Sequence, residues 1–254
     1  MASTDVARTP EERRELLKES FAQAKECTRC PELAATRKTV VFGAGNADAD
    51  LMFVGEAPGA TEDEQGIPFV GRAGKLLDTL LEEIGLQRSE VFIANTLMCR
   101  PPGNRDPLPI EIENCQEYLT TKVELIEPTV ICTLGNFSTK LLRGDPTGIT
   151  RLHGQPEVLT LGRRAVRLYP IFHPAAALYT PRMLETLRED FARLPELLAQ
   201  GAPEQPPAAA MDELAAPPER DERAELEERD DEEASSSAAA TAKQAIEPDQ
   251  LGLF

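Results

Sequence analysis

The first regular pattern along the chain is helical. Four apolar residues recur every three to four positions, as expected for one face of a helix: Leu16, Leu17, Phe21 and Ala24. Thr9 is a good N-cap residue, and Pro10 suits the first helical position because an N–H there would have no partner within the helix. We expect a helix from Pro10 to Glu26.

Short apolar runs then alternate with helical patterns as far as residue 198. The apolar runs predict strands at 51–54, 91–95, 129–134 and 165–172. The helical patterns predict helices at about 73–85, 109–126, 136–143 and 181–198. Strands separated by helices of this length form parallel sheets covered on both faces. We therefore predict an α/β fold, a three-layer α/β/α arrangement around a central, mainly parallel four-stranded sheet.

Polar or small residues follow each predicted strand. The four segments are Gly55-Glu56, Asn95-Thr96, Gly135-Asn136 and His173-Pro174. In open α/β sheets, ligands bind beyond the carboxyl ends of the strands. The pattern thus predicts one cleft built from these segments. His153 lies in a loop before a probable hairpin, and we expect no functional role for it.

Composition divides the chain near residue 200. Residues 201–254 hold 4 Lys+Arg against 15 Asp+Glu, so they supply most of the formal charge of −17. They are rich in Ala, Pro and Glu, and cannot bury enough apolar surface to offset the entropy lost on ordering. We expect one domain at 1–200 and a disordered acidic tail at 201–254.

The overall balance also bears on location and partners. The chain has no run of about 20 apolar residues that would span a membrane, and no apolar run of signal-peptide type at residues 1–10. We expect a cytoplasmic monomer with reduced thiols. The acidic surplus argues against a general nucleic-acid binder, whose binding surface is normally basic.

Four cysteines form two pairs. Cys27 and Cys30 are two residues apart, and Cys99 and Cys115 are fifteen residues apart on a predicted strand–helix unit. Four soft thiolate ligands suit zinc or an iron–sulfur cluster, and the spacing does not separate the two. The fifth cysteine, Cys132, lies inside an apolar strand, where we expect it to be a core residue.

Four motifs together resemble the family 4 uracil-DNA glycosylases. They are 55–63 (GEAPGATED), 68–74 (PFVGRAG), 95–104 (NTLMCRPPGN) and His173-Pro174. The resemblance covers about residues 25–195. It implies hydrolysis of the glycosidic bond of uracil in DNA to leave an abasic site, the first step of base excision repair. It also implies a [4Fe–4S] cluster on the four paired cysteines: Cys27, Cys30, Cys99 and Cys115.

The chemistry of base excision gives roles to the motif residues. Phe69 can stack on a flipped uracil, the Asn95 amide can read the edge of the base, and His173 can donate to O2. The turn at Glu56 and Ala57 brings backbone N–H groups close to the base. In better-known uracil glycosylases the matching turn reads Gly-Gln-Asp-Pro-Tyr, and here Ala57 and Gly59 replace its Asp and Tyr, so another residue must position the water.

Catalysis is expected from Glu56, Glu62, Asn104 and His173. We expect Glu56 to contact the base region and Glu62 or Asn104 to assist the attacking water. Glu62-Asp63-Glu64 could instead be a solvated acidic turn. The motifs contain no lysine that could form a Schiff base, so we predict excision without strand cleavage.

Several basic residues flank the predicted cleft and could contact phosphates: Arg72, Lys75, Arg100, Arg105, Arg151 and Arg182. Leu178 or Tyr179 could fill the gap left by a flipped base, or pack against the last helix. The cluster would staple the Cys27–Cys30 segment to the loop after Asn95. Two alternatives remain open, a non-catalytic iron–sulfur scaffold that binds DNA or a clamp, and a glycosylase with a broader range of deaminated bases.

The last five residues, 250–254, resemble the QLxLF-type segments that dock into sliding DNA clamps. The residues concerned are Gln250, Leu251, Leu253 and Phe254. Apolar residues at the end of a long acidic segment are suited to binding in a hydrophobic groove. We predict that deleting residues 250–254 abolishes pulldown of the sliding clamp while base excision is retained. Unchanged pulldown would refute clamp binding through this peptide.

Overall fold

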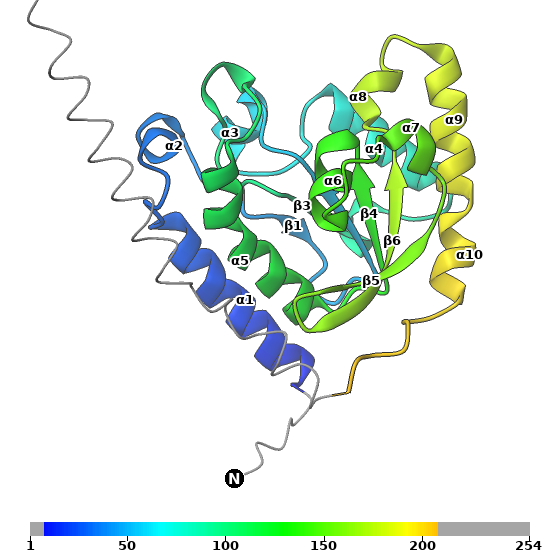
Figure 1. Cartoon of the computed structure of the whole chain (residues 1–254), viewed down its shortest axis with the longest axis horizontal. Helices are drawn as coiled ribbons and strands as arrows, with labels where there is room; N and C mark the ends of the chain where they lie inside the picture. Colours follow the sequence, from blue (N-terminus) through cyan, green and yellow to red (C-terminus); the bar gives the residue numbers. More distant parts are fainter. Residues whose placement is uncertain (1–7, 208–254) are drawn as a thin grey trace, which may run out of the picture. The chain divides into compact units, whose positions relative to one another are not determined.

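The domain is built on one mixed sheet of six strands in the order β1-β3-β2-β4-β6-β5 (Figure 1). The computed structural model describes residues 8–207, so residues 208–254 of the predicted tail, with the predicted clamp peptide, lie outside the described residues. The first seven residues of the predicted tail are described, and Gln205 exchanges hydrogen bonds with the backbone of Ala165 in β6. The strands are β1 (Ala44–Gly45), β2 (Leu51–Gly55), β3 (Phe92–Asn95), β4 (Val130–Leu134), β5 (Glu157–Leu161) and β6 (Arg164–Ile171).

The four predicted strands form the parallel centre of this sheet. β2 pairs in parallel with β3 and β4, and β4 pairs in parallel with β6. Every residue of β2, β3 and β4 is buried, as expected for strands covered on both faces. The prediction of four strands was nevertheless too low, because β1 and β5 add antiparallel edges. β1 has only two residues, and β5 is the first strand of the hairpin expected after His153.

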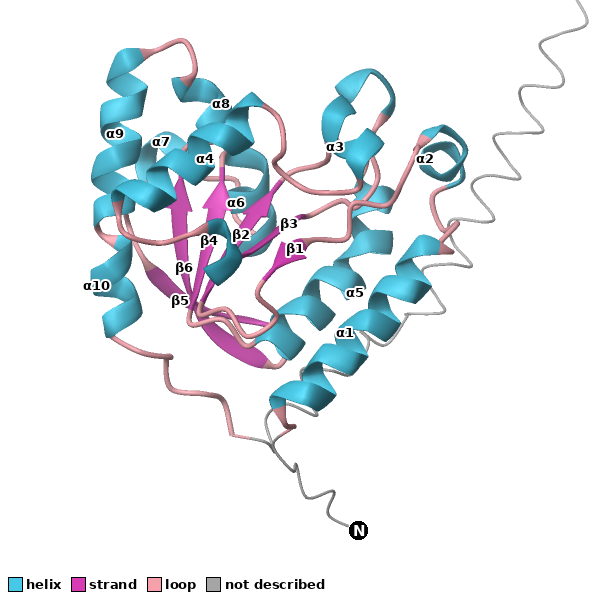
Figure 2. Cartoon of the chain, turned by 180° about the vertical axis from the view of Figure 1, so that it is seen from behind, coloured by secondary structure: helices cyan, strands magenta, loops and turns pink. Residues whose placement is uncertain are grey.

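Helices cover both faces of the sheet, which makes three layers (Figure 2). One face packs against α4 (Arg72–Glu83), α8 (Pro174–Ala177), α9 (Pro181–Ala192) and α10 (Leu194–Ala199). The other packs against α1 (Pro10–Lys25), α5 (Pro109–Ile126) and α6 (Asn136–Arg143). Cys27 follows shortly after the end of α1, so this helix leads directly to the first cysteine pair.

Most predicted helices agree with the structure to within one or two residues. The exception is the predicted helix at 181–198, which is divided into α9 and α10 at Arg193. Pro195 explains the break, because its ring lacks an N–H and clashes with the preceding turn of a continuous helix. The predicted N-cap Thr9 is confirmed, and its side chain and that of Glu12 form a capping box.

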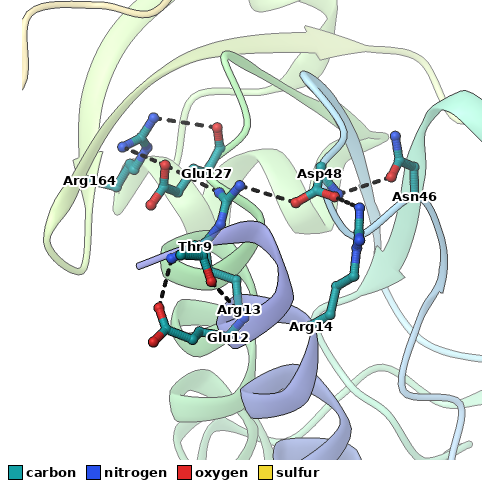
Figure 3. A network of polar contacts seen from close by, with 8 residues as sticks. All are labelled: Thr9, Glu12, Arg13, Arg14, Asn46, Asp48, Glu127 and Arg164. Atoms are coloured by element: carbon teal, nitrogen blue, oxygen red, sulfur yellow. Dashed lines mark hydrogen bonds and ion pairs between the residues drawn. The ribbon is translucent and has the colours of Figure 1, made fainter. Parts of the chain in front are cut away.

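Ion pairs anchor the start of α1 to the rest of the domain (Figure 3). Arg13 pairs with Asp48 at 3.0 Å and with Glu127 at 3.2 Å, and Arg14 also pairs with Asp48. Arg164 reaches Glu127 from β6. These contacts join α1 to the loop before β2 and to the end of α5, so they orient the helix that leads to the first cysteine pair.

The remaining elements are short. They are α2 (Pro31–Thr36), α3 (Ala60–Gln65), η1 (Arg88–Glu90), η2 (Pro102–Asn104) and α7 (Ile149–Leu152). Two of them carry predicted catalytic residues, Glu62 in α3 and Asn104 in η2. The loop after β3 is tied to the loop after β2, since the N–H groups of Thr96 and Leu97 donate to the carbonyls of Gly55 and Glu56. Within residues 8–207, no helix combines the length and apolar character needed to cross a membrane.

Candidate active site and cysteine cluster

Gly55, the last residue of β2, is the point at which an aromatic ring and an amide meet. A Cβ atom at this position would lie 2.8 Å from the Phe69 ring and closer still to Oδ1 of Asn95. Asn95 is the register partner of Gly55 on β3. Only glycine leaves room for both side chains, so a glycine at the end of β2 is needed for the ring and the amide to converge.

The Asn95 side chain has an unsatisfied hydrogen-bond acceptor. Asn95 is 3 % exposed, and its buried Oδ1 has no hydrogen-bond partner in the described part of the chain. A buried polar atom without a partner costs about 1–3 kcal/mol. An incoming N–H donor would remove that cost, so the atom marks a site built to receive a ligand.

His173 stacks against the Phe69 ring. The ring centroids are 5.5 Å apart, and a Cβ atom on Gly135 would lie 3.0 Å from the His173 Cβ. Nδ1 of His173 accepts a hydrogen bond from the Ala175 N–H at 3.1 Å. Burial lowers the pKa of His173 to about 4, an effect that Glu62 partly opposes. The imidazole is therefore neutral at pH 7, with its proton on Nε2 and available for donation.

A cavity of about 690 Å³ opens at the ends of β2 and β4, and its lining includes Glu56 and His173. Burial raises the pKa of Glu56, and the nearby Asp106 carboxylate raises it further. The lining also includes Asp106, Asn136 and Lys140, which sequence reasoning gave no role. Asn136 belongs to a strand-end segment that was already noted. Nothing in the sequence indicated that Asp106 and Lys140 line the cavity, because their positions depend on how a loop and α6 fold.

Glu62 lies in a helix and is bonded to the loop that follows it, so the alternative of a solvated turn at 62–64 is wrong. Its Oε1 accepts hydrogen bonds from the N–H groups of Val70 and Gly71, at 3.1 and 3.0 Å. The segment 62–64 is part of helix α3 and is not a solvated turn, since Asp63 is 3 % exposed and accepts from the Lys38 N–H at 3.0 Å. Glu62 thus holds the loop that carries Phe69.

Asn104 lies on an exposed loop. It has a left-handed φ of 55°, and its Oδ1 accepts from Nε of Arg100 at 2.8 Å. The cavity lining includes Glu56 and His173 but not Phe69, Asn95 or Asn104. The structure therefore brings Phe69, Asn95 and His173 together near Gly55, with His173 also lining the cavity beside Glu56, and leaves Asn104 on a neighbouring loop.

The four paired cysteines meet in one apolar cluster. Cys99 and Cys115 are each 6 % exposed and belong to it, and Cys27 and Cys30 pack against it. Two donors point at the sulfurs, from Arg37 Nη1 to Cys99 Sγ at 3.2 Å and from Asn114 Nδ2 to Cys30 Sγ at 3.4 Å. Such donors stabilise thiolates, as a cluster ligand set requires. Cys132 is fully buried in the core, which confirms its prediction.

Burial disfavours the thiolate form of these cysteines. It raises the pKa of Cys115 to about 11 and also raises that of Cys99. The positive charge of a bound metal centre would offset this penalty, because a coordinated thiol is deprotonated. Four soft thiolate donors in one apolar cluster fit an iron–sulfur cluster.

Lys122 is a buried cation near this cluster that sequence reasoning missed. It is 0 % exposed, its Nζ lies 4.1 Å from the centre of the Phe42 ring, and burial lowers its pKa to about 7. It follows Cys115 by seven residues on α5, and the Cys115 thiolate opposes the lowering of its pKa. A lysine within a helical pattern gave no sign of burial.

Comparison with known proteins decides the family. Residues 42–196 match the uracil DNA glycosylase superfamily. A type-4 uracil-DNA glycosylase from Archaeoglobus fulgidus is 42 % identical over 193 residues, which cover 74 % of this chain and 96 % of that protein. Type-4 enzymes from Sulfurisphaera tokodaii and Saccharolobus solfataricus are each 44 % identical, over 72 % and 70 % of this chain and 84 % of each relative. The chain belongs to the type-4 uracil-DNA glycosylases. The resemblance seen in the motifs is thus confirmed.

The basic residues predicted to contact phosphates in this type-4 glycosylase differ in whether their side chains already have a partner. Arg105 is held by Glu111 at 2.6 and 2.9 Å and by Glu32 at 2.7 Å. Arg100 is bonded to Asn104. By contrast, exposed positions are occupied by Arg72, Lys75, Arg151 and Arg182. The ion pairs of Arg105 compete with phosphate contact, whereas the exposed residues are available for it.

The loop after His173 presents one aromatic residue to solvent. Tyr179 is 72 % exposed, and the Arg72 guanidinium lies 5.3 Å from the centre of its ring. Leu178 is partly buried. Of the two residues considered as wedges, Tyr179 is the one that extends from the surface, and its contact with Arg72 places a cation beside it.

We predict that His173 of this glycosylase stays neutral, with the proton on Nε2, down to about pH 5. The reason is its burial, which lowers its pKa to about 4. The measurement is an NMR titration of protein labelled with ¹⁵N-histidine, and the chain has two histidines, so His153→Gln assigns both signals. A His173 signal that titrates near the ordinary value of 6.5 would contradict the prediction.

Proposed function

We propose that this type-4 uracil-DNA glycosylase draws a flipped deoxyuridine into the site around Gly55 and hydrolyses its glycosidic bond, leaving an abasic site in DNA. The observation that carries the proposal is the unpartnered Oδ1 of Asn95 beside the Phe69 ring. The fold thus supplies a flat apolar surface and an unsatisfied acceptor at one point, which is what a planar base with an N–H edge requires.

Base selection follows from the amide of Asn95. Its Oδ1 would accept from N3–H of uracil, and its Nδ2 would donate to O4. Cytosine presents an acceptor at N3 and a donor at C4, so both contacts become repulsive. Phe69 would stack on the ring, and the backbone at Glu56 and Ala57 would lie along the base.

Bond cleavage requires stabilisation of the negative charge that develops on the departing uracil. A neutral His173 with its proton on Nε2 can donate to uracil O2, where that charge accumulates. Positive charge develops on the sugar at the same time. Glu56 supplies a carboxyl group at the cavity wall. A carboxylate there favours an oxocarbenium-like sugar over the neutral ground state.

Glu62 is favoured over Asn104 as the group that assists the attacking water. Its Oε1 is committed to the Val70 and Gly71 amides, while Oε2 faces Gly59 in the turn after β2. The carboxylate of Glu62 also raises the pKa of His173 by its charge, which supports a position near the proposed base site. Asn104 is exposed and bonded to Arg100. A carboxylate fixed by one oxygen can orient a water with the other.

Contacts to the DNA would come from exposed groups on the segments that follow Phe69 and His173 in the chain. Tyr179 is suited to fill the space that a flipped nucleotide leaves in the duplex, since large side chains perform that role by stacking between bases. Arg72 beside it, together with Lys75 and Arg182, can contact phosphates. Such contacts position the DNA without reading its sequence.

Asn95→Asp should lose much of the uracil excision and gain some cytosine excision. A protonated aspartic acid can donate to N3 of cytosine, whereas an ionised one repels O4 of uracil. The measurement is formation of alkali-labile sites in oligonucleotides containing uracil, cytosine, hypoxanthine or xanthine. Asn46→Asp is the matched control, because Asn46 lies in the loop before β2, and its Oδ1 accepts from the Asp48 N–H.

Two results would overturn the assignment. If the wild-type protein makes no alkali-labile site at uracil, the enzymatic function is wrong. If Asn95→Asp keeps the wild-type preference, the amide does not read the base. Strand cleavage without alkali would contradict monofunctional excision and direct attention to Lys140 in the cavity wall.

Cys27, Cys30, Cys99 and Cys115 are proposed to hold a [4Fe–4S] cluster. Their shared apolar surroundings and the donors from Arg37 and Asn114 support the assignment. When bound, the cluster would supply a covalent link between the segment after α1, the loop after β3 and α5. The Cys99 loop also follows Asn95 closely, so the link would steady the base-reading strand end.

Cys115→Ala should lose most of the bound iron, because three thiolates cannot complete the ligand set. Iron and acid-labile sulfide per chain are measured on anaerobically purified protein, together with thermal unfolding. Cys132→Ala is the matched control, since Cys132 is equally buried but lies in β4. Equal iron content in the two variants would refute the assignment.

A further inference from the structure

The backbone at Phe69 is held in an unfavourable conformation. Phe69 has a φ of 51°, in the left-handed region, and it is 7 % exposed. A bulky residue in this region costs of the order of 1–3 kcal/mol and persists only when its surroundings enforce it. Something in the fold must therefore hold this peptide in place.

Two charged side chains form hydrogen bonds with the backbone of four consecutive residues of this loop, 68–71. Arg88, in η1, donates from Nη1 to the Phe69 carbonyl at 3.0 Å and from Nη2 to the Pro68 carbonyl. On the amide side, one Glu62 oxygen accepts from Val70 and Gly71. A guanidinium thus holds two carbonyls and a carboxylate holds the next two amides, which fixes the loop in both directions.

Arg88 is itself oriented by α4. Asp78 on that helix accepts from Nη1 of Arg88 at 3.0 Å, and the side chain of Arg88 is only 28 % exposed. The first turn of α4 also closes on the loop, because a Cβ atom on Gly74 would collide with the Phe69 carbonyl. Gly74 and Arg88 therefore both lie against the Phe69 carbonyl, and Arg88 supplies its hydrogen-bond donor.

We propose that Arg88, oriented by Asp78, is a positioning residue that holds Phe69 in its left-handed conformation and so fixes the surface on which the flipped base stacks. The inference rests on the proposed stacking role of Phe69. Arg88 need not touch the DNA or the base. Its loss would let the Phe69 peptide relax and turn the ring away from Asn95 and His173.

The test compares binding of two oligonucleotides that differ only in the base. One carries a non-hydrolysable 2′-fluorinated deoxyuridine, and the other carries an abasic site. Arg88→Met should bind the uracil oligonucleotide about tenfold more weakly, since stacking is worth about 1–3 kcal/mol per base, and should bind the abasic one as the wild type does. Arg88→Lys should not restore binding, because one ammonium cannot replace the fork that joins two carbonyls and Asp78.

Arg188→Met is the matched control. Arg188 also forms an ion pair with α4, through Glu83 at 2.8 Å, and within residues 8–207 its side-chain hydrogen bonds all go to Glu83. This variant should bind both oligonucleotides normally. Thermal unfolding of all variants shows whether a loss of binding reflects a loss of folded protein.

A tryptophan reporter gives a second measurement on the ring itself. The chain has no tryptophan, so Phe69→Trp places a single fluorophore in the loop. Binding of the uracil oligonucleotide should quench the tryptophan emission when Arg88 is present. It should quench the emission much less when Phe69→Trp is combined with Arg88→Met. Equal quenching in both backgrounds would overturn the positioning role.

The outcomes separate this inference from the proposed function. If Phe69→Ala leaves uracil binding unchanged, the stacking role is wrong. If Phe69→Ala weakens it but Arg88→Met does not, stacking stands and the role of Arg88 is refuted. If Arg88→Met weakens binding to both oligonucleotides equally, Arg88 acts on the DNA backbone or on stability, and positioning of the base surface is again refuted.

Discussion

The site depends on how closely three chain segments approach each other at Gly55. The absence of a side chain there admits the Phe69 ring from one loop and the Asn95 amide from the adjacent strand. Parallel pairing of β2 with β3 sets the register that places Gly55 opposite Asn95. A methyl group at this one position would collide with both the Phe69 ring and the Asn95 amide, so the geometry of the proposed base site depends on a steric constraint at a strand end.

The irregular loops around this point are stabilised by charged side chains bonded to backbone groups. Glu62 and Arg88 hold the Phe69 loop, and Asp63 accepts from the Lys38 amide. Loops lack the repeating partners of helices and strands, so side chains must satisfy their amides and carbonyls. Near the cysteines, Arg37 donates to the Lys25 carbonyl and also to the Cys99 sulfur. Charged side chains thus hold the loops of both the proposed base site and the cysteine cluster.

The parallel core of the sheet could be predicted because its strands are buried on both faces and appear as continuous apolar runs. The edge strands could not be predicted in the same way. β1 is two residues long, and β5 alternates between partly buried and exposed residues, so both depend on the neighbour they pair with. The break before α10 was visible as Pro195, but the apolar pattern continues on both sides of it and predicted a single helix.

The sequence by itself determined the family, the α/β class, the strand-end motifs and the grouping of the cysteines, because these follow from residue type and spacing. Only the tertiary structure decided which polar groups are engaged. It tied one oxygen of Glu62 to the Phe69 loop, placed Asn104 with Arg100, buried Lys122 and left Oδ1 of Asn95 without a partner. Hydrogen bonding and burial depend on neighbours distant along the chain, which residue spacing does not reveal.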